Sequence, residues 1–235
     1  MRSATVSPRI VAESLRQVHD PGATALRAGP SASVDSVARS IALTLLPTEA
    51  AIDPPEWLRP AQHAPYRRAA HALERHGGAL LAQPVGSGKT WVALALAQRL
   101  KRLNGTGETC VLVPTPLVSH WRRTAQALGA TIMVLTHARA SRGSLPASDG
   151  MVIIDESHHF RNPLTRRYAA VAPWLLGRRA LLLSATPVVN RLDDLAAQLR
   201  LAVRDDALAA SGIGSLSVLL ASGLGHPALS DVVIS

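Results

Sequence analysis

The stretch LLAQPVGSGKTW, residues 80–91, decides the fold class of this chain, because an apolar run ends there in a glycine-rich turn before a helix-like segment. Gly86 and Gly88 have no Cβ, so backbone N–H groups can surround phosphate oxygens at this turn. Lys89 stands where it would reach the β- and γ-phosphates of a nucleotide, and the Thr90 hydroxyl stands where it would bind Mg²⁺. The pattern predicts a P-loop between a strand and a helix.

Short apolar runs alternate with helix-like segments on both sides of this stretch, from about residue 58 onward. Strands that are apolar throughout are buried on both faces, whereas a half-exposed strand would alternate polar and apolar residues. We therefore expect an α/β fold in three layers, a parallel sheet with helices on both faces. The expected strands are GALLA (78–82), TCVLVP (109–114), ATIMVLT (130–136), MVIID (151–155) and ALLLSA (180–185).

Polar residues follow two further strands directly, at the edge of the sheet where such folds bind ligands. Asp155 and Glu156 come after MVII. Asp155 can hold Mg²⁺ through water, and Glu156 can orient and deprotonate an attacking water molecule. SATP, residues 184–187, follows the last run and is by itself an ordinary strand exit. Behind a P-loop, we interpret the two acids as part of a magnesium-dependent phosphate site rather than as surface acids.

Two neighbouring histidines and a cysteine raise other kinds of chemistry. His158 and His159 would suit zinc, but no second pair of Cys or His stands at a ligand spacing, so we expect coupling or packing roles. Cys110 is the single cysteine and lies in an apolar run, so it cannot form an intrachain disulfide. We interpret it as a small buried side chain rather than a catalytic thiol.

The net charge of +9 and the isoelectric point of about 11.2 would draw the chain toward polyanions such as nucleic acid. Nearly all of this charge is arginine, since Lys89 and Lys101 are the only lysines, and such a bias can also reflect genomic base composition. Charge alone therefore leaves nucleic-acid binding open. No run approaches the roughly 20 apolar residues of a membrane span, and the N-terminus lacks a secretory signal, so we expect a cytoplasmic protein without membrane contact.

Composition divides the chain into three parts. Residues 1–55 are rich in Ser, Ala, Arg and Pro and are expected to form a partly helical, partly flexible extension. Glu13, Asp20 and Asp35 argue against a transit peptide there. Residues 56–205 are expected to form the nucleotide-binding domain. Residues 206–235 are expected to be a tail or truncated continuation, because no further series of strands and loops is visible.

Together these segments resemble the first RecA-like lobe of superfamily-two helicases, in particular the Swi/Snf-type, DEAD/DEAH-like DNA-dependent ATPases. That family's phosphate loop reads Leu-Ala-x-x-x-Gly-x-Gly-Lys-Thr, which explains why Gln83 replaces the usual first glycine of a P-loop. The resemblance covers roughly residues 57–202, and Ser157 departs from the alanine usual in the acidic motif. Its motifs are LRPAQHAPYRRA (58–69), LAQPVGSGKT (81–90), VLVPTPLVSHWRRTAQAL (111–128), IIDESHHFRNP (153–163) and LLLSATPVVNRLDDLAAQL (181–199).

The resemblance implies a RecA-like P-loop NTPase fold and a role for each motif. Gln62 would read the adenine of ATP. Thr115, Pro116 and Trp121 would lie near a nucleic-acid backbone, while His137 would pack or contact nucleic acid. The coupling of ATP state to strand contact would involve His158, Ser184 and Thr186. The implied nucleotide contacts are Gln62, Gly86, Ser87, Gly88, Lys89 and Thr90, with Lys89, Asp155 and Glu156 catalytic and Thr90 and Asp155 on Mg²⁺.

Two functional hypotheses remain, because such motors hold ATP between two RecA-like lobes and this sequence shows only one. The first is the ATP-binding lobe of a nucleic-acid helicase or translocase, with DNA as the expected track. This lobe is either a fragment of a split or truncated protein or one that receives its second lobe from another chain. The second is a catalytically feeble nucleotide- or nucleic-acid-binding module that acts through a partner. The intact P-loop and acidic pair favour the first hypothesis, and the length favours the second. A P-loop kinase or GTPase has no use for VPTPLVSHW or SATPVVN.

Overall fold

The computed structural model describes residues 52–235 except for 106, 144, 148–149, 188–191 and 223–225. These residues belong to one compact unit, which extends from Pro47 to Ser235. The N-terminal extension expected over residues 1–55 lies almost wholly outside the described residues, as do Val188, Val189 and Asn190 of the last motif.

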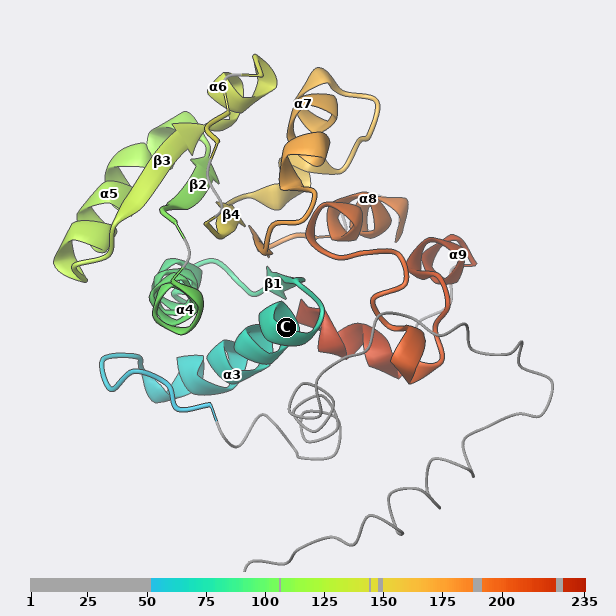
Figure 1. The fold of residues 1–235 in the computed structure, drawn as a ribbon, viewed down its shortest axis with the longest axis horizontal. Coiled ribbons are helices and arrows are strands. Elements are labelled where there is room, and N and C mark those ends of the chain that lie inside the picture. Colours follow the sequence, from blue (N-terminus) through green and yellow to red (C-terminus); the bar gives the residue numbers. More distant parts are fainter. Residues whose placement is uncertain (1–51, 106, 144, 148–149, 188–191, 223–225) are drawn as a thin grey trace, which may run out of the picture. The chain divides into compact units, whose positions relative to one another are not determined.

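A parallel sheet forms the centre of this unit (Figure 1). The strand order is β3-β2-β4-β5-β1-β6, and every pairing in it is parallel. The five strands expected from the sequence are confirmed, with ends that shift by at most two residues. The strands are β1 Gly78–Ala82, β2 Thr109–Val113, β3 Ile132–Thr136, β4 Val152–Ile154, β5 Ala180–Ser184 and β6 Val233–Ile234.

Helices cover both faces of the sheet, which confirms the expected three-layer α/β architecture. One layer holds α3, α4 and α5, and the other holds α6, α7, α8 and α9 (Figure 1). The α-helices are α3 Pro60–Arg75, α4 Lys89–Asn104, α5 Val118–Ala127, α6 His137–Ser141, α7 Arg166–Leu175, α8 Leu192–Ala202 and α9 Leu216–Ala221. Short 3₁₀ helices are η2 Thr115–Leu117, η3 Ser157–Phe160, η4 Ala209–Ser211 and η5 Pro227–Asp231.

The sheet has a hydrophobic core on each face. Successive residues of each strand pack alternately in the two cores, because side chains alternate between the two faces of a sheet. Leu81 and Ile153 pack in the core beneath α3, α4 and α5. Leu80 and Ile154 pack in the core beneath α7 and α8. This arrangement explains why the strand sequences are apolar without interruption.

The end of the chain belongs to the same sheet, which differs from the tail expected over residues 206–235. β6 pairs with β1, with Leu80 opposite Val233 and Leu81 opposite Ile234. The Leu80 N–H also donates to the Val232 carbonyl at 2.8 Å. This strand could not be predicted, because a two-residue edge strand is too short to produce a periodic pattern and depends on β1 for its hydrogen bonds.

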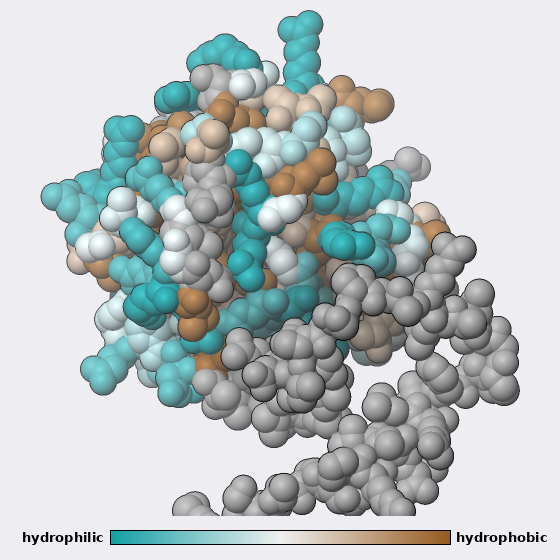
Figure 2. Space-filling model, viewed as in Figure 1, coloured by the Kyte–Doolittle hydropathy of each residue, from teal (hydrophilic) through white to brown (hydrophobic). Residues whose placement is uncertain are grey.

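The surface of the described unit is mixed in character. On the face in view, hydrophobic residues are interspersed with hydrophilic ones (Figure 2). Large apolar side chains that are exposed come from separate elements, such as Val85 in the P-loop, Leu164 before α7 and Val218 in α9. Within residues 52–235 as described, no helix is both long and apolar enough to cross a membrane.

Candidate nucleotide site at the carboxyl edge of the sheet

The P-loop connects β1 to α4 at the carboxyl ends of the strands. Gly86 and Gly88 have φ angles of +83° and +86°, in the left-handed region that side chains with a Cβ rarely adopt. Gly88 is also the residue before α4 begins. A Cβ at Gly88 would lie 2.0 Å from Gln62 Nε2, so a larger residue here would strain the backbone and displace the end of the Gln62 side chain.

Lys89 lies in the first turn of α4 and is folded back on its own loop. Its Nζ donates to the carbonyls of Gln83 at 2.7 Å and Pro84 at 2.9 Å. Burial lowers the pKa of Lys89, while the carboxylates of Asp155 and Glu156 oppose that change. The ammonium group is therefore close to both acids, and phosphate oxygens can take the place of the two carbonyls as its acceptors.

Ser87 provides an independent test of whether the loop fits an anion. Its hydroxyl is buried and has no hydrogen-bond partner among the residues that the structure describes. A buried hydroxyl without a hydrogen-bond partner is costly in free energy. The residues just before Ser87, including Gly86, are exposed, so a ligand can reach this loop. With Lys89 and Thr90 in the adjoining helical turn, these groups fit the phosphates of a nucleotide and an Mg²⁺ ion bound to them.

Gln62 joins the upstream motif to the P-loop. Its Nε2 donates to the carbonyls of Ser87 at 3.2 Å and Gly88 at 3.3 Å, and its Oε1 accepts from the Arg59 N–H at 3.0 Å. The Gln62 side chain is buried, and its hydrogen bonds hold the backbone of the P-loop in place. The structure thus places Gln62 at the loop, while its expected contact with adenine stays a prediction.

Asp155 and Glu156 follow β4 at the same edge. Glu156 has φ +50° and ψ +49°, and it is the one residue other than glycine with positive φ in the described part of the chain. Such strain at a non-glycine residue is a reason to examine a site for function. Burial raises the pKa of Asp155, and hydrogen bonds from the Trp121 indole and the Glu156 N–H oppose that shift.

Trp121 joins α5 to the acidic motif. Its side chain is fully buried, and its Nε1 donates to Asp155 Oδ2 at 2.8 Å. Its expected place near a nucleic-acid backbone stays a prediction. Thr115 and Pro116, in η2 before the same helix, are exposed, so their expected contact with nucleic acid stays a prediction.

The residues expected to couple ATP state to strand contact form a connected group. Ser184 is buried, and its Oγ accepts from the Thr186 N–H at 3.1 Å. His158 Nδ1 lies 3.4 Å from Ser184 Oγ and 3.2 Å from Glu156 Oε2. The structure therefore connects the last motif to the acidic motif through His158.

Sequence reasoning missed Gln198, which makes a second connection between these motifs. This fully buried side chain of α8 accepts from Ser157 Oγ at 2.8 Å through Oε1. Its Nε2 donates to the Pro187 carbonyl at 2.6 Å. A glutamine on the apolar side of DDLAAQLRL was the available signal, because buried amides are retained only where their hydrogen bonds are satisfied.

His137 packs within the protein. It is buried, with edge-to-face contacts to His159 at 5.7 Å and Phe160 at 5.0 Å between ring centroids. Burial, with smaller effects from Arg167 and His159, lowers the pKa of His137 to about 4. No cluster of three or more His, Cys, Asp or Glu suited to a metal lies within the described residues.

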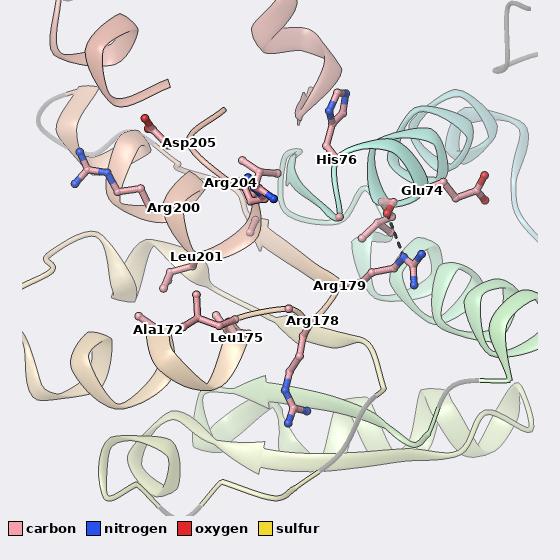
Figure 3. Close-up of a pocket in the computed structure, with 16 residues that line it drawn as sticks. Glu74, His76, Ala172, Leu175, Arg178, Arg179, Arg200, Leu201, Arg204 and Asp205 are labelled. Atoms are coloured by element: carbon pink, nitrogen blue, oxygen red, sulfur yellow. Dashed lines mark hydrogen bonds between the residues drawn. The ribbon is translucent and has the colours of Figure 1, made fainter. Parts of the chain in front are cut away.

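A hollow of about 570 Å³ lies at the opposite edge of the sheet, where the strands begin (Figure 3). Arg178 and Arg200 extend away from the apolar side chains of Leu175 and Leu201 in this view. Three of the arginines that line the hollow have hydrogen-bond partners: Arg179 donates to the Leu73 carbonyl, Arg200 donates to Ser217 and Arg204 pairs with Asp206. Arg178 lies over the Trp174 ring, and its buried Nη1 has no hydrogen-bond partner among the described residues. None of the motif residues lines this hollow, so its size does not identify the nucleotide site.

Two sequence families match adjoining parts of the chain. Residues 56–129 match "Type III restriction enzyme, res subunit", and residues 130–208 match "SNF2-related domain". Together with the relatives described below, these two matches support the Swi/Snf-type superfamily-two helicase N-terminal lobe that the motifs indicated.

Individual relatives agree with this assignment. An uncharacterized ATP-dependent helicase of Bacillus subtilis is 30% identical over 142 residues, which are 51% of this chain and 25% of that protein. The Bos taurus SWI/SNF-related matrix-associated actin-dependent regulator of chromatin subfamily A-like protein 1 is 30% identical over 165 residues, 60% of this chain and 17% of that protein. The chain thus spans a quarter or less of the length of these two curated relatives.

Solved structures confirm the fold of the Swi/Snf-type lobe. The Sulfolobus solfataricus SWI2/SNF2 ATPase core in complex with dsDNA has a TM-score of 0.55 and 21% identity, covering 64% of this chain and 37% of that one. The Pyrococcus furiosus Hef helicase domain has a TM-score of 0.50 and 17% identity, covering 63% of this chain and 37% of that one. At these identities the likeness supports the RecA-like fold alone.

Proposed function

We propose that this lobe binds ATP and Mg²⁺ and hydrolyses ATP to ADP and phosphate as part of a nucleic-acid helicase or translocase. The observation that carries the proposal is the convergence of Lys89, Asp155 and Glu156 at one edge of the sheet, beside the unpartnered hydroxyl of Ser87. A phosphate site with a positively charged donor, a metal ligand and a base is what ATP hydrolysis requires.

Different residues of the chain bind the phosphates and the Mg²⁺ ion. Lys89 exchanges the carbonyls of Gln83 and Pro84 for the β- and γ-phosphate oxygens of ATP. The Ser87 hydroxyl donates to the same anion, and α4 directs its positive N-terminal end at it. Thr90 and Asp155 hold Mg²⁺, which neutralises charge that develops on the phosphates during hydrolysis.

Glu156 is the proposed general base. Its carboxylate accepts a proton from the attacking water while the water oxygen bonds to the γ-phosphorus and the bond to the bridging oxygen breaks. The strained backbone at Glu156 directs the residue into the site, and His158 at 3.2 Å holds the carboxylate on one side. Through Ser184, His158 then links this base to Thr186, the group that we propose couples hydrolysis to movement.

A second RecA-like lobe is part of the proposal, whether it belongs to a longer form of this chain or to a separate chain. In GTPases an arginine supplied from outside the site raises the rate by about 10³ to 10⁵, and we expect the second lobe to act similarly. This lobe alone is then expected to bind ATP and to hydrolyse it feebly.

We propose DNA as the track. The relative from Sulfolobus solfataricus was solved with dsDNA, and the net charge of +9 here favours a polyanion. Thr115 and Pro116 are exposed and are the proposed contacts with the phosphate backbone, which suits a motor because phosphate contacts are indifferent to sequence. A cytoplasmic location is part of the same proposal.

The experiment that tests this function is ATP hydrolysis by the purified chain with and without double-stranded DNA or RNA, alongside calorimetric titration with MgATP. Glu156→Gln is the control, because it keeps the shape of the side chain and removes the base. DNA-stimulated hydrolysis that is lost in this variant supports a working site. Binding without hydrolysis supports a lobe that needs its second half, and no binding of MgATP contradicts the proposed function.

A further inference from the structure

We propose that Trp121 is a positioning residue that aims the Asp155 carboxylate at Mg²⁺ and connects this carboxylate to the segment Thr115–Leu117, in which Thr115 and Pro116 are exposed. This inference rests on the proposed function, because it takes Asp155 to be a metal ligand.

The hydrogen bonds of Asp155 show how the indole would act. Oδ1 accepts from the Glu156 N–H at 2.9 Å, and Oδ2 accepts from Trp121 Nε1 at 2.8 Å. A carboxylate oxygen has two lone pairs, so each oxygen retains one that a water molecule of the Mg²⁺ ion can use. With one donor on each oxygen, the plane of the carboxylate is fixed before any metal arrives.

A neutral donor is chemically suited to this position. Asp155 is only 7% exposed, and an unpaired carboxylate at that depth is costly. An arginine or lysine at the position of Trp121 would stabilise the charge, but it would also neutralise the ligand and repel Mg²⁺. The indole N–H supplies a single hydrogen bond without a charge, so the carboxylate stays available to the metal.

The indole has no freedom to turn away from Asp155. Trp121 is fully buried in the core beneath α3, α4 and α5, and its N–H is its only polar group. The hydrogen-bonded pair is itself buried, so water does not compete for the donor. Rotation of the ring would leave both Asp155 Oδ2 and the indole N–H with lost hydrogen bonds.

The chain also connects this pair to the surface. Trp121 lies one turn into α5, which begins at Val118, directly after the segment Thr115–Leu117, whose first two residues are exposed. On the other side, the Asp155 N–H donates to the Leu112 carbonyl of β2, the strand that leads into the same segment. A ligand that shifts this segment therefore moves the indole relative to the carboxylate, which couples nucleic-acid contact to the metal ligand.

The test compares Trp121→Phe with Trp174→Phe. Phenylalanine keeps an apolar ring and removes the indole N–H. Trp174 is the matched control, because its Nε1 also donates a hydrogen bond of 2.8 Å, to the Pro146 carbonyl, and it lies in the last turn of α7 beside Arg178, at the amino edge of the sheet. The affinity for ATP is measured by calorimetry across a series of Mg²⁺ concentrations and in EDTA, after circular dichroism has shown that each variant is folded.

We expect Trp121→Phe to raise the Mg²⁺ concentration needed for half-maximal ATP binding by about 10- to 100-fold, as losses of groups that orient metal ligands do. ATP affinity in EDTA should be unchanged, and Trp174→Phe should match the parent throughout. In an Asp155→Asn background, adding Trp121→Phe should have little further effect on the Mg²⁺ dependence. Equal Mg²⁺ dependence for the two tryptophan variants overturns the positioning role.

A second measurement uses the parent protein, so it does not depend on the folding of Trp121→Phe. The four tryptophan indole N–H resonances are recorded by ¹⁵N NMR and assigned with Trp57→Phe, Trp91→Phe and Trp174→Phe. The Trp121 resonance should shift when Mg²⁺ is added to the ATP-bound protein and again when DNA is added, and that of Trp174 should not. A Trp121 resonance that ignores both ligands overturns the proposal. A parent protein with no Mg²⁺-dependent ATP binding overturns the proposed function as well, which separates the two failures.

Discussion

The two edges of the sheet differ in which features occur together. At the carboxyl edge, Ser87 Oγ is buried without a partner in the described structure, Glu156 has a strained backbone and Lys89 is folded onto its own loop. At the amino edge, Arg179, Arg200 and Arg204 line a hollow of about 570 Å³ and donate hydrogen bonds within the protein, while Arg178 Nη1 is buried without a hydrogen-bond partner in the described structure. Neither an unpartnered atom nor the size of a hollow therefore marks the site alone, and the carboxyl edge stands out because it adds a strained residue and a cation near two acids.

Helix direction explains why charged groups act differently at the two edges. α4 begins at the carboxyl edge, so its positive end faces the proposed phosphates. α3 and α8 end at the amino edge, with Arg75 and Arg200 in their last turns. Cations there offset the negative helix ends, which gives these arginines a structural role that needs no ligand.

Replacing one cation at each edge should have the largest effect, because it separates phosphate binding at the carboxyl edge from the structural role of the arginines at the amino edge. Lys89→Ala removes a charged donor to the phosphates, so we expect ATP affinity to fall by about 10- to 100-fold. Arg179→Ala at the amino edge should leave ATP affinity unchanged. Calorimetric titration of both variants with MgATP measures the difference. Parent-like affinity in Lys89→Ala would remove the P-loop assignment, and an equal loss in Arg179→Ala would break the distinction between the edges.

A pair of glycines gives the next largest effect, now on stability. A Cβ at Gly78, at the amino end of β1, would lie 2.0 Å from the Ala202 carbonyl oxygen. Gly78→Ala should therefore lower the free energy of unfolding by about 1 to 3 kcal/mol, since backbone has to move. Gly86 has open space around it, so Gly86→Ala strains only a backbone with φ +83° and should cost about 1 kcal/mol.

Urea unfolding of both glycine variants, followed by circular dichroism, checks this order. Gly86→Ala should weaken ATP binding more than its stability loss suggests, because it alters the loop itself. Gly78→Ala should leave the ATP affinity of the folded fraction unchanged. If Gly86→Ala proved the less stable of the two, the space that we infer around the P-loop would be wrong.

Much of the fold could be predicted because five strands, four of them buried, are largely apolar and each leads into a turn. The site's location could also be predicted, since parallel strands bring Lys89 and Asp155 to one edge. The hydrogen bond from Trp121 could not. Whether a helical side chain faces the core or the solvent depends on how the helix packs, and a motif does not encode that. Gln198 and β6 were missed for the same reason, since their partners are distant in sequence.

The stability of the protein should depend on pH because His137, at the carboxyl edge of the sheet, is buried. His137 has a pKa of about 4 in the folded protein, against an ordinary value of about 6.5 in the unfolded chain. As pH falls from about 6.5 toward 4, the unfolded chain takes up a proton that the folded protein refuses, so stability is lost across this window. Between pH 7.5 and 5.5 we expect the parent to lose about 1 kcal/mol on this account.

His137→Phe isolates that contribution, because phenylalanine keeps the ring contacts and does not titrate. Urea unfolding at the two pH values should show a smaller loss in the variant than in the parent. Burial also raises the pKa of Asp155, which acts in the opposite direction, but that effect is common to both proteins and cancels in the comparison. Identical pH dependence in the two proteins would mean that His137 is not buried as a neutral side chain.

The smallest expected effect tests the amino edge directly. Arg200 and Arg204 line the hollow, yet Arg200 bonds to Ser217 and Arg204 forms an exposed pair with Asp206. Exposed pairs contribute about 0 to 1 kcal/mol, and a cation at a helix C-terminus adds about the same, so Arg200→Ala with Arg204→Ala should change stability only slightly. ATP affinity, measured as for Lys89→Ala, should be unchanged. A tenfold loss would mean that the amino edge takes part in nucleotide binding, and the assignment of the nucleotide site to the carboxyl edge alone would then be wrong.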